Sequence, residues 1–126
     1  MHQRSFLQNA SAQFAGLAAL RGSQDSVLEM TRIFDTRRQF IVDGLNAIDG
    51  ISCADARGAF YAFPNITQTG LTSQAAQDLL LEEAGIAAIA GTSFGDFGEG
   101  YLRFSYANSK ENIEIALERF AKVLAK

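Results

Sequence analysis

The side chain best suited to chemistry in this chain is Arg103, which lies in the apolar stretch GEGYLRFSYA at residues 98–107. Aromatic and aliphatic residues recur there at every second position after a glycine-rich start, a pattern that predicts a β-strand. Leu102 and Phe104 then share one face of the strand, and Arg103 lies on the other. Because a guanidinium stays protonated, it needs an anion or water in such a setting. Its planar fork can bind a ligand carboxylate or phosphate, or it can pair with a carboxylate of the chain such as Glu99.

Phe94 is the second candidate site residue, because it lies in a glycine-rich loop, residues 90–98, just before the strand of Arg103. Exposed aromatic side chains on loops more often line an interface or a ligand pocket than serve no purpose. The glycines of this loop do not open a helix, so they do not form a nucleotide-binding fingerprint; turns and close backbone approach account for them. We expect Tyr61 and Tyr101 to be core aromatics whose hydroxyl groups reach water.

Other kinds of catalytic or binding site have little support in the sequence. His2 and Cys53 are the only histidine and the only cysteine of the chain. They cannot supply a Ser-His-Asp triad or a cluster of soft metal ligands, so we expect no metal site. A single cysteine also cannot form an internal disulfide, so nothing calls for an oxidising compartment.

The composition excludes several classes of protein. The chain has 126 residues, 48% of them hydrophobic, with a formal net charge of -3. This length and composition predict a globular domain with a sizeable core, and the acidic balance argues against a nucleic-acid surface. No apolar run reaches the roughly 18 residues of a membrane span, and the N-terminal residues lack the apolar core of a signal peptide. We therefore expect a cytoplasmic protein with neither nucleic acid nor membrane as a partner.

The periodicity along the chain predicts helices and strands in the order helix, long helix, strand, strand, helix, strand, strand, helix. The expected helices span residues 5–20, 25–49, 73–84 and 110–126, and the expected strands span residues 51–53, 59–63, 86–89 and 98–107. The strand at 86–89 is apolar throughout, which favours an internal position in the sheet. The order fits an α+β fold: a small, mostly antiparallel sheet with helices packed on one face, plus a long N-terminal helix. We divide the chain into an N-terminal helical segment, residues 1–22, and a domain, residues 23–126, that includes the long helix.

Several of these segments, taken in order, resemble the C-terminal part of the class I and II aminotransferases, the pyridoxal-phosphate enzymes of fold type I typified by aspartate aminotransferase. The resemblance rests on Asn46, GISC at 50–53, GAFYAFP at 58–64, AGTSFG at 90–95 and GYLRFSYA at 100–107. It extends over essentially the whole chain, and the last motif is highly specific. The helix at residues 10–20, together with Arg37 and Arg38, also resembles the interdomain segment of that family. Ala56 and Ala90 depart from the pattern, since many relatives have proline there.

The resemblance implies a role for Arg103: in the family, the matching arginine binds the α-carboxylate of the amino acid or 2-oxo acid substrate through a two-pronged salt bridge. Phe94 is implied to line the same site. The cofactor of the complete enzyme would be pyridoxal 5'-phosphate, held in a large domain that supplies a lysine for covalent attachment. The lysines present here are Lys110, Lys122 and Lys126, and none of them matches that lysine. The resemblance therefore implies a small domain with its connecting helix, which binds no cofactor and has no aminotransferase activity by itself.

Two alternatives stand beside the substrate-binding domain of an aminotransferase. The first is a non-catalytic small-molecule-binding or regulatory module that kept Arg103. The second is a structural partner that completes an enzyme supplied by another chain. In each case the first two helices carry apolar stripes, including Phe6, Phe14 and Met30, that a large domain would normally cover. Such stripes tend to be buried by self-association, so we expect a homo-oligomer formed through the N-terminal helices.

Overall fold

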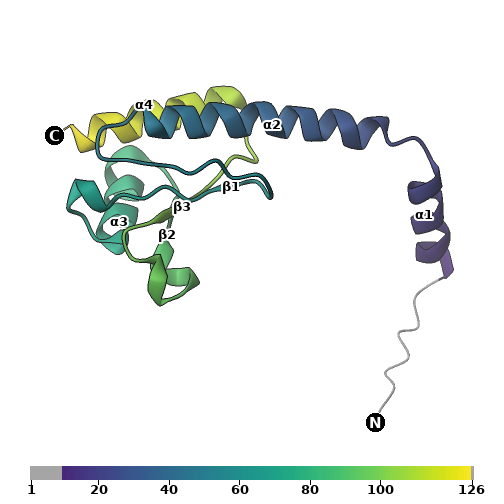
Figure 1. The fold of residues 1–126 in the computed structure, drawn as a ribbon, viewed down its shortest axis with the longest axis horizontal. Coiled ribbons are helices and arrows are strands. Elements are labelled where there is room, and N and C mark those ends of the chain that lie inside the picture. Colours follow the sequence, from purple (N-terminus) through teal and green to yellow (C-terminus); the bar gives the residue numbers. More distant parts are fainter. Residues whose placement is uncertain (1–9, 126) are drawn as a thin grey trace, which may run out of the picture. The chain divides into compact units, whose positions relative to one another are not determined.

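The structure, a computed structural model, describes residues 10–125 and contains helices around a small sheet (Figure 1). The helices are α1 (Ala10–Arg21), α2 (Asp25–Asn46), α3 (Ser73–Ala84) and α4 (Lys110–Leu124); the strands are β1 (Tyr61–Ala62), β2 (Ile89–Ala90) and β3 (Leu102–Ser105); the short 3-10 helices are η1 (Thr67–Thr69), η2 (Gly91–Phe94) and η3 (Asp96–Gly98). Two compact units, Met1–Arg32 and Ile33–Lys126, divide within α2. His2, Phe6, Lys126 and the first part of the expected N-terminal helix lie outside the described residues.

The three strands form an antiparallel sheet in the order β1-β3-β2, with the strand of Arg103 in the centre. This arrangement confirms the α+β prediction. The prediction of an internal strand at residues 86–89 is wrong, because β2 is an edge strand. Its burial alternates: Ala88 and Ala90 are buried, whereas the side chain of Ile89 is 38% exposed. The apolar run therefore reflects one covered face rather than two.

The segment at residues 51–53, where a strand was expected, forms less sheet structure than predicted. Only Ser52 pairs, in an isolated bridge with Asn65, which in turn bridges to Tyr101. The reason lies in Asn46 at the end of α2, whose side-chain amide donates to the Cys53 carbonyl at 3.0 Å and accepts from the Cys53 N–H at 2.8 Å. These two bonds occupy the backbone groups that a longer ladder would need.

The helix ends follow their capping residues. Thr72 is the N-cap of α3, since its hydroxyl accepts from the Ala75 N–H at 3.2 Å. Gly85 ends the same helix in the left-handed conformation with φ +64°. Ser109 caps α4 through the Asn112 N–H. In each case a side-chain oxygen or a glycine satisfies backbone groups that the helix leaves without partners.

The core of the second unit lies between the sheet and the helices α2, α3 and α4. Leu102 and Phe104 of β3 point into it, and Phe104 stacks on Phe120 of α4 with ring centroids 5.6 Å apart. Figure 1 shows α2 and α4 on the same side of the strands. Residues from all three helices, including Leu45, Leu80 and Phe120, complete the core. The sheet face that carries Arg103 is thus the one turned away from this core.

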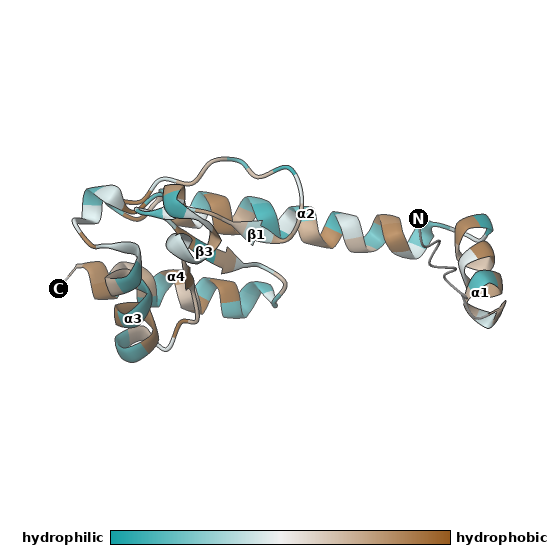
Figure 2. Ribbon diagram, turned by 90° about the horizontal axis from the view of Figure 1, so that it is seen from below, coloured by the Kyte–Doolittle hydropathy of each residue, from teal (hydrophilic) through white to brown (hydrophobic). Residues whose placement is uncertain are grey.

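The first unit has a different character, because α1 contains no buried residue. Figure 2 shows hydrophobic segments along α1 and along α2, and Leu20 of α1 is 83% exposed. Phe14 and Leu28 are likewise exposed. None of the helices within residues 10–125 has the length and hydropathy needed to cross a membrane.

Candidate functional site

Arg103 lies at the centre of the sheet with its guanidinium over two aromatic rings. Its Cζ atom is 4.4 Å from the ring centroid of Tyr61 and 4.3 Å from that of Phe94. Tyr61 belongs to β1, one neighbour of β3 in the sheet, and Phe94 belongs to η2, which directly follows β2, the other neighbour. Both distances fall within the range in which a cation is attracted to an aromatic face. The two rings therefore restrict where the planar group can lie.

Arg103 has no anionic partner in the described part of the chain: its guanidinium makes neither a hydrogen bond nor an ion pair with any of residues 10–125. The alternative partner considered from sequence, Glu99, instead accepts a hydrogen bond from the Ser73 N–H at 3.0 Å. Arg38 provides a contrast, since it pairs with Asp35 at 2.8 Å and also with Asp55. A partly buried guanidinium without an anion retains donors that a ligand carboxylate can use.

Tyr61 was expected to be a core aromatic, and its position against Arg103 corrects that expectation. Tyr61 pairs with Ser105 across the β1–β3 ladder. Ser105 and Arg103 are two residues apart on one strand, so they share a face, and Tyr61 shares it as their cross-strand neighbour. Period-two patterning alone could not reveal this contact, because it depends on which residue of β1 lies opposite β3.

Further aromatic rings extend the site beyond Arg103. Phe63 stacks on Tyr101 with centroids 5.3 Å apart and planes 12° apart, and it meets Phe94 edge-on at 6.3 Å. Phe94 is 50% exposed, so this wall is open to ligands from solvent. Phe97 of the same loop is 98% exposed and has no ring contact within the described residues. The expectation that the 90–98 loop places Phe94 beside Arg103 is confirmed, while its role in binding stays a prediction.

The glycines of the loop allow an unusually close backbone approach. A Cβ atom on Gly98 would overlap the carbonyl oxygen of Gly91, and one on Gly91 would overlap that of Gly98. The Gly91 N–H also donates to the Tyr101 carbonyl at 2.8 Å, which ties the start of η2 to the start of the Arg103 strand. Close approach, as expected from the sequence, is therefore the reason for glycine at both positions. It fixes the base of the loop that carries Phe94.

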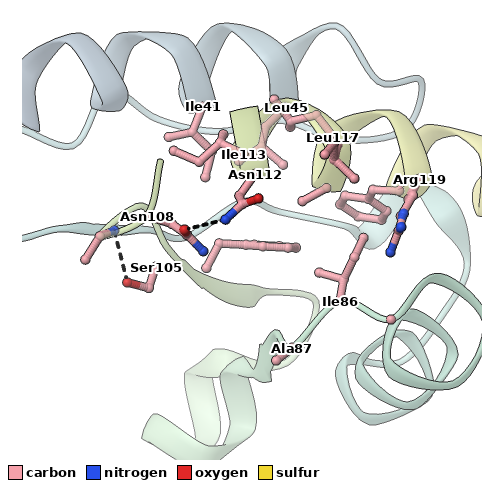
Figure 3. A pocket seen from close by; sticks show the side chains of 16 residues that line it. Ile41, Leu45, Ile86, Ala87, Ser105, Asn108, Asn112, Ile113, Leu117 and Arg119 are labelled. Carbon is pink, nitrogen blue, oxygen red and sulfur yellow. Dashed lines mark hydrogen bonds between the residues drawn. The ribbon is translucent and has the colours of Figure 1, made fainter. Parts of the chain in front are cut away.

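A separate cavity of about 480 Å³ lies between α2, α4 and the segments 85–87 and 104–108 (Figure 3). Ile41 and Leu45 of α2 face Ile113 and Leu117 of α4 across it. Its polar rim is already engaged: the Asn112 side chain donates to Asn108 at 2.9 Å, and Arg119 donates to the Ala84 carbonyl at 3.2 Å. Neither Arg103 nor Phe94 lines this cavity, so it is not part of the candidate site.

Metal and thiol chemistry find no support in the described residues. No three histidine, cysteine, aspartate or glutamate side chains between residues 10 and 125 cluster closely enough to hold a metal ion. Cys53 is a buried free thiol, and burial raises its pKa above the ordinary value. A raised pKa keeps the thiol protonated near neutral pH, which is the opposite of what a reactive cysteine requires.

Comparison with known proteins places these features in a family. The family model described as "Aminotransferase class I and II" matches residues 1–120. An aspartate aminotransferase of Pyrococcus horikoshii is 44% identical over 114 residues, which are 89% of this chain and 29% of that protein. YugH, a putative aminotransferase of Bacillus subtilis, is 42% identical over 117 residues, which are 93% of this chain and 30% of that protein.

Solved structures agree with the sequence comparison. A crystal structure of an aromatic aminotransferase from Pyrococcus horikoshii superposes with a TM-score of 0.85 at 42% identity, covering 90% of this chain and 31% of that one. An aspartate aminotransferase mutant of Thermus thermophilus, complexed with tryptophan, gives a TM-score of 0.76 at 38% identity, covering 89% and 29%. The chain thus spans about 30% of the length of the relatives it matches. On this evidence the chain belongs to the class I and II aminotransferase family.

Proposed function

We propose that this chain is the C-terminal, substrate-carboxylate-binding domain of a pyridoxal-phosphate-dependent amino acid aminotransferase, and that Arg103 receives the carboxylate. One observation carries the proposal: the Arg103 guanidinium lies over the rings of Tyr61 and Phe94 and has no anion of its own within residues 10–125. Two parallel N–H donors of a guanidinium match the two oxygens of a carboxylate. A substrate carboxylate would complete the charge pairing that the chain leaves open.

The contact is expected to be weak in the isolated chain. One two-pronged pair at an open site contributes about 1–3 kcal/mol net. Millimolar affinity requires roughly 4 kcal/mol, so carboxylates should bind Arg103 only at concentrations well above millimolar. In the complete enzyme the same contact would serve mainly to orient the substrate, since a correctly placed reactant loses less entropy on reaching the transition state.

The lysines of this chain do not fit the role of the cofactor lysine. Lys110 and Lys122 both belong to α4, and the Lys110 ammonium lies over the ring of Phe40, 4.7 Å from its centroid. When bound in a complete enzyme of this family, pyridoxal phosphate acts as the electron sink for the amino acid. What we assign to this chain is limited to binding and orienting the substrate carboxylate and to shielding it from water with aromatic rings.

Carboxylate binding can be measured on the isolated chain by following the Nε–Hε signals of its arginines in ¹H–¹⁵N NMR spectra during titration with sodium acetate. The Arg103 signal is assigned as the one lost in Arg103→Lys. We expect acetate to shift this signal more than that of Arg57, whose side chain is exposed and already lies near Asp55. Sodium chloride at equal ionic strength should leave it in place. Equal responses of Arg103 and Arg57 would contradict the proposal.

A carboxylate-binding module without catalysis is the second function that the Arg103 geometry fits. The two functions differ in whether the domain supports turnover once a large domain is supplied. Grafting this chain onto the rest of the Pyrococcus horikoshii aspartate aminotransferase, at 44% identity, provides that large domain. We expect the chimera to transfer amino groups and the isolated chain to show none. A folded, cofactor-loaded chimera without activity would favour the module.

The exposed apolar residues of α1 and of the first part of α2, among them Phe14, Leu20 and Leu28, lead us to propose a homo-oligomer formed through these helices. Their burial on self-association would remove apolar surface from water. Sedimentation velocity across a concentration series checks this, with Leu20→Ser and Leu28→Ser as the variant. A wild-type chain that stays monomeric at high concentration would contradict the oligomer.

A further inference from the structure

Ser73, the first residue of α3, is the only polar residue in the buried core of the described chain. Its hydroxyl uses its full hydrogen-bonding capacity. The oxygen accepts from the Gly100 N–H at 2.8 Å and from the Tyr101 N–H at 3.2 Å, and the hydroxyl donates to the Gly98 carbonyl at 3.3 Å. One side chain therefore binds three backbone groups of a segment that lies 25 or more residues away in sequence.

That segment, residues 98–101, is a tight turn that leads directly into β3. Gly100 has φ +81°, a conformation that other residues adopt only with strain. The turn is also held by the Ile66 N–H, which donates to the Gly100 carbonyl at 2.7 Å. Gly98 abuts Gly91 at the base of the Phe94 loop. The turn thus joins the start of β3 to the start of that loop, and Ser73 is the side chain at its centre.

The contacts continue from the turn to Arg103. Tyr101, whose N–H is bound by Ser73, stacks on Phe63; Phe63 meets Phe94; and Phe94 lies against the Arg103 guanidinium. The backbone N–H of Ser73 also donates to Glu99, the one nearby carboxylate that sequence offered as a partner of Arg103. The N-terminus of α3 stabilises the negative charge of the Glu99 carboxylate. Glu99 therefore stays bound to Ser73 and does not pair with the Arg103 guanidinium.

We propose that Ser73 is a positioning residue for the Arg103 site. By binding residues 98–101 it sets the placement of the Phe94 ring, and so keeps the guanidinium oriented and available to a ligand carboxylate. This inference rests on the proposed function of Arg103, but its structural part, the placement of the ring against Arg103, can be measured without any ligand.

The test compares Ser73→Ala with Thr72→Ala in the full 126-residue chain, by the Arg103 Nε–Hε signal and by thermal unfolding. Thr72→Ala is the matched control, because it removes a hydrogen bond from the same end of α3 without touching residues 98–101. In the wild type we expect the Tyr61 and Phe94 rings, 4.4 Å and 4.3 Å from the Arg103 Cζ atom, to displace the Hε signal from the position of an exposed arginine. We expect Ser73→Ala to move it toward the Arg57 position and to weaken acetate binding by up to about fivefold, the most that losing the contact of the Phe94 ring with Arg103 would cause. Thr72→Ala should lower the melting temperature but leave the position of the Arg103 signal and the strength of acetate binding unchanged.

The outcomes separate this inference from the proposed function. If Ser73→Ala and Thr72→Ala both lower the melting temperature and neither moves the Arg103 signal, Ser73 is merely structural and the inference is overturned. If wild-type Arg103 does not respond to acetate, the proposed function fails, while the ligand-free signal still shows whether Ser73 places the ring. Should Ser73→Ala not fold, Ser73→Cys keeps the size of the side chain with a much weaker hydrogen-bonding group, and the same shift is expected of it.

Discussion

The two faces of β3 share one backbone and differ in what covers them. On one face Leu102 and Phe104 are buried under the helices, and Tyr106, just past the strand, continues the same face with its hydroxyl donating to the Ala59 carbonyl at 3.0 Å. On the other face Arg103 lies under aromatic rings with no anion from residues 10–125, and Ser105 is exposed. The described residues cover the first face by themselves and leave the second with a cation that has no counter-charge among them.

This difference implies a division of roles. Burial of apolar surface is the main source of stability, so the covered face should dominate the free energy of unfolding. A cation held in a defined place without a partner is the arrangement expected of a binding site, since its charge pairing awaits a ligand. Substitutions on the covered face should therefore lower stability, and substitutions on the face of Arg103 should weaken carboxylate binding.

The largest effect is expected for Phe104→Ala on the covered face. Removing a buried aromatic ring that stacks on Phe120 should lower the free energy of unfolding by about 3–5 kcal/mol. Urea denaturation followed by circular dichroism measures this. The matched control is Ser105→Ala, the next residue along and on the opposite face, which should change stability by no more than about 0.5 kcal/mol. Similar losses from both substitutions would remove the distinction between the faces.

The next effect belongs to Arg103 and should appear in activity rather than in stability. In the chimera with the Pyrococcus horikoshii large domain, Arg103→Lys keeps the charge but loses the planar fork, and kcat/KM should fall by about 100-fold. Arg57→Lys, at an exposed arginine, is the control and should leave kcat/KM unchanged. In the isolated chain Arg103→Lys should leave the melting temperature nearly unaltered. A large drop in melting temperature with normal turnover would assign Arg103 to the fold instead.

A smaller effect, with a pH dependence, is expected for Tyr106. Burial raises its pKa above the ordinary value of 10.0, so the unfolded chain loses this proton at lower pH than the folded chain does. The stability that this difference supplies is present below pH 10 and is lost as the pH rises through the folded pKa. Tyr106→Phe should cost about 1 kcal/mol at neutral pH through the lost hydrogen bond to Ala59. Its stability should then fall less steeply than that of the wild type above pH 10, as urea titrations at several pH values can show. Parallel declines would mean that Tyr106 does not titrate differently on folding.

The sequence predicted the features that depend on local patterns. Alternation at residues 98–107 predicted the strand and the opposite faces of Phe104 and Arg103, and the helix expected from residue 110 begins there in α4, after the N-cap Ser109. Both follow from the geometry of a single element. The aminotransferase motifs then led to the family, which the comparisons confirm.

Features that depend on how separate elements meet could not be predicted. The contact of Tyr61 with Arg103 requires the β1–β3 register, and the edge position of β2 requires the strand order. In the sequence Ser73 is only the expected first residue of a helix. Its role was missed because its hydrogen bonds join it to residues 98–101, which are distant in sequence. The sequence also left open whether Arg103 pairs with Glu99; the choice depends on Ser73, which holds Glu99 and so leaves Arg103 without an ion pair within residues 10–125. Each of these depends on long-range packing that periodicity does not encode.

The smallest effect on the face of β3 that carries Arg103 is expected for Phe94. A cation over an exposed aromatic ring gains about 0.5–1 kcal/mol, so Phe94→Ala should weaken acetate binding at Arg103 by about two- to fivefold. The physical reason is orientation: without this ring the guanidinium is left with Tyr61 alone, and more of its freedom must be lost when a carboxylate binds. Phe97→Ala is the control, because it removes an equal ring from the same loop at a position that is 98% exposed. The same NMR titration of the Arg103 signal measures both variants. Tighter acetate binding in Phe94→Ala would mean that the ring obstructs the guanidinium rather than orients it. The Arg103 guanidinium would then be oriented by Tyr61 and by residues 98–101, which Ser73 binds.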